Sequence, residues 1–483
     1  MKKWTVALCL LSLSILLRLP YYFFGVINWD ESTVILVAQS LLDGYLPYTE
    51  LWDIKPPLIF VAYALFILVL GKSIIAIRFA GTLCVFLTSW FVYLIGNKLG
   101  NNSAGILAGV LSIIAASTLT GDAQTTLSEH VAVVPLLAGL TLLVTREMTL
   151  KILCGGGILL TVATMIRLNL AYTVVAVGIW LVCATKSKTV NIKGIVAYCL
   201  GSFSVIFLTY FPYLVTGNSL IWWNSVILAP LSYSQSEVQF DLLFKVCLAF
   251  AIAIGLWKLL KSEHQQQFVL LQVACLGTTI SVIQGGEFHL HYLIQIFPFL
   301  SLTIALFWSK LPYKILRLFA IAWLTFKLSG YISPVVSQYY EVGDRLITGK
   351  SLPYGVTYEI ADYLKRHNRE KKPVYLIKDH IVYWLNDLQP LSKSATHPSN
   401  LAKEYLFPFI EGSSPSTEAE LARILKQQPE FIVTKSPLSF VDRTPEIKTL
   451  LEQTLNSKYK LVKQIERHEI GQVSLIYQLK QVK

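Results

Sequence analysis

Long apolar runs separated by short polar segments dominate the first 332 residues of the chain. Most runs are long enough to cross a hydrocarbon core of about 30 Å as helices, which rise about 1.5 Å per residue. The pattern therefore predicts an all-α polytopic membrane domain. The runs lie near 4–24, 57–71, 74–96, 103–120, 129–145, 151–185, 194–214, 242–260, 267–284, 291–308 and 313–332.

The run at 57–71 is too short for a comfortable crossing, because a helix of this length rises only about 22 Å. Basic residues give an independent test, since Lys and Arg collect on the cytoplasmic side of membrane proteins. If 57–71 crossed the membrane, the basic segments at 97–98 and 146–151 would lie outside, although Lys2 and Lys3 begin inside. We therefore interpret 57–71 as a juxtamembrane or re-entrant helix.

The run at 151–185 has basic segments on both sides, so it requires an even number of crossings. Two short helices that turn at Arg167, Leu168 and Asn169 on the outer face meet this requirement. These interpretations predict about eleven transmembrane helices in a plasma membrane, with a cytoplasmic N-terminus and an extracytoplasmic C-terminus. The first run lacks a small-residue cleavage site, so we expect it to remain as an uncleaved span.

The last part of the chain, 333–483, has the shorter and more polar patterns of a soluble domain. Helical periodicity marks 356–367 and 417–427, and strand-like runs occur at 373–378, 431–434 and 473–479. We expect a small C-terminal α/β domain outside the membrane, following a membrane domain over 1–332. It contains no Gly-rich phosphate loop and no nucleophile elbow, so its expected role is to cover the outer cavity or to position an acceptor.

Composition and charge agree with a membrane protein, with 54% hydrophobic and 14% charged residues. The net charge of +12 does not indicate a nucleic-acid partner, because the Lys and Arg residues stand mainly between apolar runs, where they act as topology signals. The expected partners of this surface are membrane lipids. None of the seven cysteines shows ligand-like pairing, so neither a disulfide framework nor a zinc site is indicated.

Acidic and aromatic residues gather in the segment 25–57, between the first run and the short helix. Its charged residues are a single Lys55 and five acids, Asp30, Glu31, Asp43, Glu50 and Asp53. An ordinary negatively charged outer loop would explain the acids alone. Disordered acidic loops are poor in aromatic residues, however, so the following residues predict an ordered segment: Trp29, Tyr45, Tyr48 and Trp52.

Three motifs in this segment resemble the GT-C glycosyltransferases, and most closely the protein O-mannosyltransferases (glycosyltransferase family 39) and the lipid A aminoarabinose transferases. The motifs are an Asp-Glu pair at 30–31, Gly-Tyr-Leu-Pro-Tyr at 44–48 and Lys-Pro-Pro-Leu at 55–58. Weaker matches are Arg78-Phe79-Ala80, Asp122 with Glu129, Arg167-Leu168-Asn169, and His291-Tyr292 leading to Pro298. The resemblance covers roughly residues 1–330, but 32–34 reads Ser-Thr-Val where many relatives carry a Tyr.

This resemblance implies a GT-C-like fold and an enzyme that moves a sugar from a polyprenyl-phosphate-linked donor to an acceptor at the outer face of the membrane. It also implies inversion at the sugar, by a single displacement. The acceptor can be a lipid, a glycan or a protein, because the motifs concern the donor.

Asp30 matches the family's catalytic aspartate and is the candidate general base, which takes the proton of the acceptor hydroxyl. A well-placed base contributes roughly 10²- to 10⁴-fold in rate. Glu31 is a second catalytic candidate that would tune or orient Asp30, or help to hold a divalent cation if the reaction uses one. A helix cap or a solvated acid is an equally suitable role for Glu31.

Lys55 matches the family's Lys-Pro-Pro lysine and suits the developing charge on the lipid phosphate, because opposite charges about 4 Å apart near a protein surface attract by roughly 4 kcal/mol. A snorkelling interfacial lysine is the alternative. Arg167 interrupts an apolar run, and an intramembrane arginine indicates a functional site by default. We expect it to be a second phosphate contact, whereas Arg18 fits a side chain that snorkels to the interface.

The remaining substrate-binding candidates are polar residues that the predicted topology brings to the same outer face. Of the two acids near the start of the run at 129–145, Glu129 is favoured over Asp122. The residues before the tenth span could contact phosphate, sugar or a metal, although a histidine pair two residues apart also suits an ordinary interfacial turn. This group is Glu287, His289, His291 and Tyr292.

A transporter or flippase of a lipid-linked saccharide is the competing class of protein. Transporters commonly show internal repeats and ionisable groups near mid-membrane. The sequence has no clear repeat, and its charges gather at the outer ends of the runs, with Arg167 as the one feature that favours transport. A catalytically silent scaffold with the same fold is a third alternative, because fold does not determine function.

Overall fold

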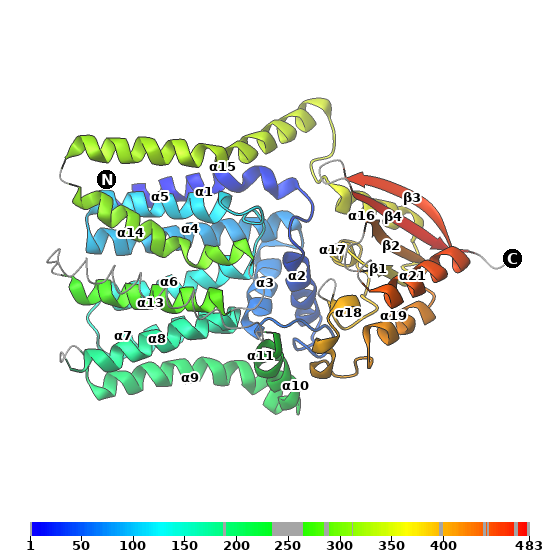
Figure 1. Cartoon of the computed structure of the whole chain (residues 1–483), viewed down its shortest axis with the longest axis horizontal. Helices are drawn as coiled ribbons and strands as arrows, with labels where there is room; N and C mark the ends of the chain where they lie inside the picture. Colours follow the sequence, from blue (N-terminus) through cyan, green and yellow to red (C-terminus); the bar gives the residue numbers. More distant parts are fainter. Residues whose placement is uncertain are drawn as a thin grey trace.

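The computed structural model describes residues 2–480, except 187–189, 234–263, 285–288, 312, 396–398, 438–440, 442–443 and 468–471. A helical bundle forms one end of the molecule, and a small sheet with its covering helices forms the other (Figure 1). The predicted crossing at 242–260 and the candidate residue Glu287 lie outside the described residues.

The bundle consists of helices that run side by side and follow the apolar runs of the sequence (Figure 1). Among the described residues, five helices are long and apolar enough to cross a membrane, and shorter apolar helices accompany them, so the chain is a multi-pass membrane protein. The bundle helices are α1 (Lys3–Arg18, continued by η1, Leu19–Phe23), α4 (Ile74–Leu99), α5 (Asn102–Thr118), α6 (Ser128–Thr145), α7 (Leu150–Ile166), α8 (Ala171–Ala184), α9 (Ile192–Val215), α13 (Gln265–Ile283) and α14 (Phe297–Lys310).

Local sequence explains where these helices begin and how closely they pack. Side chains of Ser73, Asn101 and Asn191 accept a hydrogen bond from the third backbone N–H that follows, which satisfies a donor that the helix leaves free. Gly157 of α7 and Gly201 of α9 let the two backbones approach so closely that a Cβ at either position would meet a carbonyl of the other helix.

The predicted division of 151–185 is confirmed. Helix α7 ends at Ile166, a 3-10 turn (η2, Leu168–Leu170) follows, and α8 begins at Ala171. The run at 291–308 is also divided, because η4 (Leu290–Gln295) precedes α14. Both breaks lie at the end of the bundle that faces the sheet domain and place polar side chains there.

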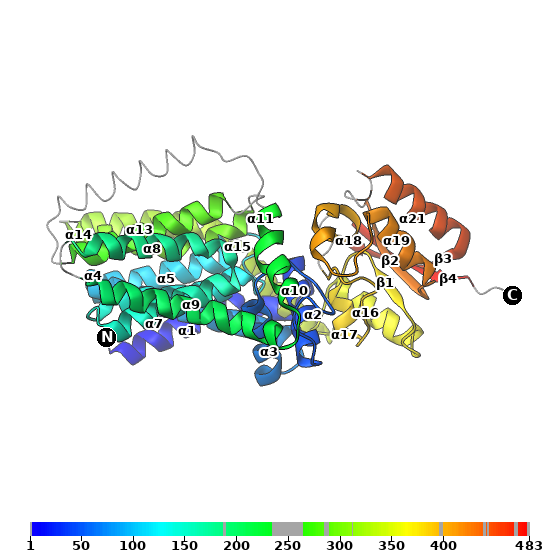
Figure 2. The same ribbon diagram turned by 90° about the horizontal axis from the view of Figure 1, so that it is seen from below.

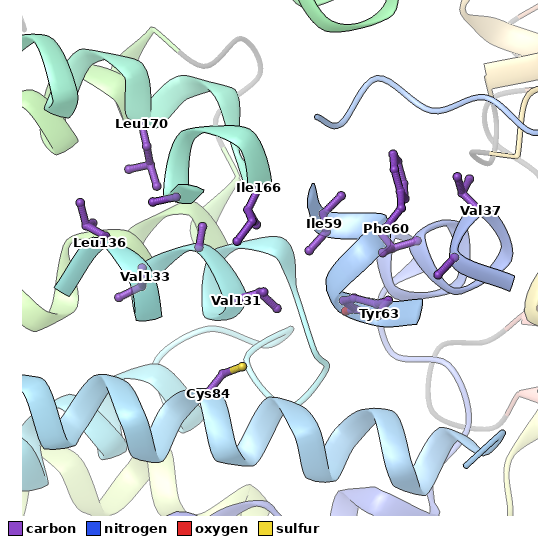
Figure 3. Packing of buried hydrophobic residues seen from close by; sticks show 14 of the residues in the cluster. Val37, Ile59, Phe60, Tyr63, Cys84, Val131, Val133, Leu136, Ile166 and Leu170 are labelled. Carbon is purple, nitrogen blue, oxygen red and sulfur yellow. The ribbon is translucent and has the colours of Figure 1, made fainter. Parts of the chain in front are cut away.

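Two helices lie across this end of the bundle, between it and the sheet domain (Figure 1). They are α2 (Trp29–Leu42) and α3 (Pro57–Leu70). The buried face of α3 carries Ile59 and Tyr63, which look toward Val131 of α6 and Ile166 of α7 (Figure 3). Three short helical segments lie at the same end (Figure 2): α10 (Ser219–Trp223), η3 (Asn224–Leu228) and α11 (Ala229–Tyr233).

The position of α3 agrees with a juxtamembrane helix. Lys55 precedes its first residue, and Lys72, just after its end, forms an ion pair with Asp387 of the sheet domain. Both ends of α3 therefore lie on the same side of the bundle.

Helix α15 (Lys314–Thr348) joins the bundle to the sheet domain, and the predicted boundary at 332/333 falls inside it. The apolar run ends near residue 332, but helical hydrogen bonding continues through a more polar stretch. It stops at Gly349, whose φ of +68° is the left-handed conformation typical of a helix C-terminus.

The sheet has the order β1-β2-β4-β3, with β1 parallel to β2 and the other pairs antiparallel. Its strands are β1 (Val374–Leu376), β2 (Phe431–Ser436), β3 (Tyr459–Arg467) and β4 (Gln472–Leu479). The register pairs Ile432 with Tyr375 on one side and with Tyr477 on the other. The accompanying helices are α16 (Val356–His367), α17 (Ile381–Leu385), α18 (Ser399–Ala402), η5 (Glu404–Phe409), α19 (Thr417–Lys426) and α21 (Pro445–Lys458).

The predicted helices at 356–367 and 417–427 and the three predicted strands are present, so the small α/β domain is confirmed. The sequence prediction missed β3 and α21. Strand β3 lies at the edge of the sheet and reads Tyr-Lys-Leu-Val-Lys-Gln-Ile-Glu-Arg, which lacks the continuous apolar run of a central strand.

The juxtamembrane position of α3 predicts opposite labelling of two cysteines in a cysteine-free background. Lys72→Cys, at the end of α3, should react with a membrane-impermeant thiol reagent added outside the cell. Asn101→Cys, which follows the crossing by α4, should be protected until the membrane is permeabilised. Protection of Lys72→Cys together with labelling of Asn101→Cys would show that α3 crosses.

Candidate active site

Asp30 and Lys55 meet at the sheet-domain end of the bundle because each is held at the start of a transverse helix. The side chain of Asn28 caps α2 by accepting the Asp30 N–H at 2.8 Å, so Asp30 stands in the first turn with 36% of its side chain exposed. The Tyr48 hydroxyl donates to the Lys55 carbonyl at 2.7 Å. The Lys55 ammonium lies 3.5 Å from Asp30 Oδ1 and 3.1 Å from Oδ2 of the buried Asp53.

The charges of this pair stabilise each other. Burial alone would raise the pKa of Asp30, but Lys55, His291 and Arg167 outweigh it and lower that pKa below its ordinary value. Burial opposes the charged form of Lys55, but Asp30 and Asp53 outweigh burial and raise the pKa of Lys55. At neutral pH the site therefore presents an accessible carboxylate beside an ammonium group that can bind an anion.

Arg167 reaches the same site from the break between α7 and η2, where its backbone is extended. Its guanidinium lies 3.0 Å from Glu129 Oε1, donates to Ser128 Oγ at 2.9 Å, and stands over the Tyr292 ring at 4.4 Å from the ring centroid. The broken helix thus brings a cation to the end of the bundle. This is the position that the sequence predicted for Arg167.

The 3-10 turn η4 adds imidazole groups to the site. His291 Nδ1 lies 3.2 Å from Asp122 Oδ2, and its Nε2 lies 3.6 Å from Glu129 Oε1. His289 stacks on His291 with ring centroids 5.4 Å apart. Of the two acids, Asp122 is the accessible one, with 38% of its side chain exposed, whereas Glu129 is buried behind Arg167. The geometry does not support the preference for Glu129 over Asp122.

Glu31 is not a solvated acid, and its carboxylate is committed to structure. It is buried and lies 3.1 Å from the guanidinium of Arg78, which is also buried, while its second oxygen accepts the Thr126 N–H at 2.9 Å. Arg78 donates in addition to the carbonyl oxygens of Tyr21, Phe24 and Gly25. Glu31 therefore positions α2, and with it Asp30.

The expectation that Arg18 snorkels is wrong. Its side chain is buried and donates to the backbone carbonyls of Ala123, Gln124 and Thr125. The sequence could not show this, because those acceptors are main-chain atoms more than 100 residues away in the chain.

A divalent cation finds no ready set of ligands in the part of the chain that the structure describes. Within it, no group of three or more His, Cys, Asp or Glu side chains is arranged to hold a metal. Of the candidate ligands that the sequence suggested, Glu31 is occupied by Arg78 and the Thr126 N–H, and His291 contacts Asp122 and Glu129.

The C-terminal domain contacts two tryptophans of the outer segment, each of which is next to a residue of the site. Trp29, next to Asp30, has the ammonium groups of Lys378 and Lys435 at 4.6 and 4.8 Å from its ring, and both lysines come from the sheet domain. Trp52, next to Asp53, forms a parallel bridge with Ser394.

Sequence reasoning gave no role to several residues that build the site, and only one of them had a readable signal. Arg78 interrupts the apolar run of α4, which is the feature that drew attention to Arg167. The other residues are Asp53, Ser128, Trp29, Trp52, Lys378 and Lys435. The contacts that Trp29 and Trp52 make with the sheet domain join segments that are distant in the sequence.

Comparison of the structure with solved structures shows which fold this is. ArnT from Cupriavidus metallidurans bound to undecaprenyl phosphate matches with a TM-score of 0.58 and 12% identity, over 98% of this chain and 97% of that chain. The archaeal oligosaccharyltransferase AglB from Archaeoglobus fulgidus, in complex with an inhibitory peptide and a dolichol-phosphate, matches with a TM-score of 0.55 and 10% identity, over 89% of this chain and 69% of that chain. The fold is therefore that of the GT-C membrane proteins.

A family comparison agrees with the structural one. Residues 54–215 match the family model described as dolichyl-phosphate-mannose-protein mannosyltransferase. No curated protein sequence matches the chain. The solved structures thus show a GT-C-type fold, and residues 54–215 are similar to a family of membrane mannosyltransferases.

The buried Glu31–Arg78 pair predicts a large stability effect. Arg78→Met should cost about 3–5 kcal/mol, because it leaves a buried carboxylate without its counter-ion. The exposed Lys350–Asp344 pair provides the control, since Lys350→Met should cost no more than about 1 kcal/mol. Thermal unfolding of the purified protein in detergent would compare the two, and equal melting temperatures would contradict the role of Arg78.

Proposed function

We propose that the chain is a glycosyltransferase that moves a sugar from a polyprenyl-phosphate-linked donor to an acceptor at the outer face of the membrane, with inversion. The observation that carries the proposal is the Asp30–Lys55 pair, an accessible carboxylate 3.5 Å from an ammonium group at the end of a membrane bundle. It is supported by the GT-C fold and by the lipid phosphates named with the ArnT and AglB structures.

In a single displacement, Asp30 suits the attacking acceptor hydroxyl and Lys55 suits the leaving phosphate. Asp30 accepts the proton of the acceptor hydroxyl as its oxygen forms a bond to the anomeric carbon of the sugar. The bond from that carbon to the phosphate oxygen breaks on the opposite side. The phosphate leaves with an additional negative charge, and Lys55 and Arg167 neutralise it.

The lipid-phosphate donor explains why the cations stand at the end of the bundle. A polyprenyl chain lies in the bilayer while its phosphate stays at the interface, where Lys55 and Arg167 are held. In a transporter, ionisable groups would be expected near mid-membrane instead. Among the described residues, the candidate charges gather at one end, around the breaks at 167–170 and 290–295.

Asp30→Asn tests the transferase directly. It should reduce transfer by roughly 10²- to 10⁴-fold and leave donor binding intact, because the amide cannot accept the proton. Asp43→Asn, at the exposed end of α2, is the matched control and should behave like wild type.

Mass spectrometry of polyprenyl-phosphate sugars and envelope glycans in a deletion strain gives the readout. Rescue by wild type and Asp43→Asn alone, with lipid-linked sugar accumulating in the Asp30→Asn strain, would identify donor and acceptor together. Rescue by Asp30→Asn would remove Asp30 from the mechanism and favour transport or a scaffold.

Lys55→Met should move the acid limb of the pH–rate profile to higher pH. Asp30 must be ionised to act as a base, so activity is lost as pH falls through its pKa. In the wild type that pKa is lowered below its ordinary value of about 3.9. Without Lys55, burial is opposed only by His291 and Arg167, and the pKa rises.

The profile of kcat/KM against pH measures this shift. Lys72→Met removes a lysine at the other end of α3 and should leave the acid limb in place. An unchanged acid limb in Lys55→Met would show that Asp30 does not act as the base.

A further inference from the structure

Tyr48 has an unusual backbone conformation for an aromatic residue. Its φ of +73° lies in the left-handed region, which bulky side chains rarely adopt. Such a conformation is strained, and it persists only where the surrounding structure imposes it, typically at a functional site. In the described part of the chain, the other non-glycine residues with positive φ all belong to the sheet domain: Lys371, Asp379, Asp387 and Gln428.

The Tyr48 side chain is anchored to two helices of the membrane domain. It is buried, with 1% of the residue exposed. Its ring packs edge to face against Phe60 of α3, with centroids 5.9 Å apart, and against Tyr213 of α9, with centroids 6.2 Å apart. The Tyr213 hydroxyl also donates to the carbonyl of Pro47 at 3.2 Å. The bundle therefore fixes both the ring of Tyr48 and the backbone just before it.

Backbone hydrogen bonds close a compact turn around Tyr48. The Tyr48 N–H donates to the Leu51 carbonyl at 3.0 Å, and the Thr49 N–H donates to the Leu46 carbonyl at 3.2 Å. Together with the buried ring, these bonds hold Tyr48 in the left-handed conformation.

The Tyr48 hydroxyl reaches from this turn to the backbone of Lys55, where it donates to the carbonyl at 2.7 Å. Lys55 lies outside α3, because Pro56 and Pro57 follow it and a residue before proline is disfavoured in the helical conformation. Neither proline has an N–H to donate, and no side chain caps the start of α3. Tyr48 thus gives Lys55 a fixed point that the helix itself does not supply.

The Lys55 ammonium has to lie accurately, because it contacts carboxylates from two different segments. It lies 3.5 Å from Oδ1 of Asp30, on α2, and 3.1 Å from Oδ2 of Asp53, in the segment before α3. A shift of the Lys55 backbone would lengthen one contact or both. Misplacing a group of an active site by about 1 Å can cost roughly 10²-fold in rate.

We propose that Tyr48 is a positioning residue for Lys55, and that its left-handed backbone, its ring and its hydroxyl together hold the ammonium group beside Asp30. Tyr48 is buried and acts only through Lys55. The consequence for sugar transfer rests on the proposed function, whereas the effect on Lys55 does not.

Tyr48→Phe tests the proposal, because it removes the hydroxyl and keeps the ring. The kcat of sugar transfer should fall by roughly 10- to 100-fold, while the acceptor KM stays as in wild type. The acid limb of the pH profile of kcat/KM should move to higher pH, because Lys55 lowers the pKa of Asp30 less when it is misplaced. A residue that only stabilised the fold would leave the acid limb in place.

Tyr45→Phe is the matched control. Tyr45 belongs to the same Gly-Tyr-Leu-Pro-Tyr motif, but about half of it is exposed. This variant should have the kcat and the acid limb of wild type.

The double variant Tyr48→Phe/Lys55→Met separates positioning from stability. Since Tyr48 acts through the Lys55 side chain, Tyr48→Phe should cause no further loss of kcat once Lys55 is replaced. The losses in melting temperature should instead add, because the hydroxyl bonds to a backbone carbonyl that the replacement of Lys55 leaves in place. Additive losses of kcat would overturn the proposal, as would a Tyr48→Phe variant with the kcat and acid limb of wild type.

Competitive labelling of lysines with acetic anhydride measures the effect on Lys55 without any transfer reaction. In full-length protein in lipid nanodiscs, mass spectrometry should find Lys55 about 3- to 10-fold more reactive in Tyr48→Phe than in wild type. Looser pairing with Asp30 and Asp53 lowers the pKa of Lys55 toward its ordinary value, by roughly half to one unit for this change. Lys72, at the other end of α3, should react equally in both proteins.

Labelling also separates this proposal from the proposed function. Higher reactivity of Lys55 in Tyr48→Phe, in a protein that transfers no sugar, would contradict only the proposed function. Equal reactivity of Lys55 in the two proteins would contradict only the role of Tyr48.

Discussion

The buried ion pair of Glu31 and Arg78 is the interaction on which the arrangement of the site depends. Arg78 belongs to α4, a helix of the bundle, and Glu31 to α2, which lies across the end of the bundle. Through backbone contacts the pair also fixes the end of η1 and the segment before α6. Breaking a buried ion pair leaves an unpaired charge in the interior and strongly destabilises the fold. Any arrangement that separates Glu31 from Arg78 would therefore cost a large part of the stability.

The C-terminal domain is part of the site and more than a cover for it. Lys378 and Lys435 hold the Trp29 ring next to Asp30, and Ser394 pairs with Trp52 next to Asp53. These contacts act on residues adjacent to Asp30 and Asp53, while the Asp30–Lys55 pair itself comes from the membrane domain. The proposed sugar transfer would then depend on the contact between the two domains, although neither Asp30 nor Lys55 belongs to the C-terminal domain.

The hydrophobic pattern predicted much of the fold, because crossing a bilayer demands long apolar helices that are visible in any sequence. Charge placement predicted the break at Arg167, and length together with charge placement predicted the unusual position of α3. The prediction failed where the pattern carries no apolar signal, as in the second half of α15 and in the edge strand β3. Within the site, Asp30, Lys55 and Arg167 were found through motifs or an out-of-place charge, whereas Trp52 and Ser394 depend on backbone pairing between distant segments.

Helix α15 has 35 residues, and at about 1.5 Å per residue it is roughly 50 Å long, more than the hydrocarbon thickness of a bilayer. It forms a stiff arm between the last part of the bundle and the sheet domain. A helix turns by about 100° per residue, so inserting or deleting one residue would swing the attached domain around the arm and carry Lys378 and Ser394 away from their tryptophans. The number of residues in this helix therefore fixes the rotation of the sheet domain as well as its distance from the bundle. A change of about seven residues, two full turns, would best preserve that rotation.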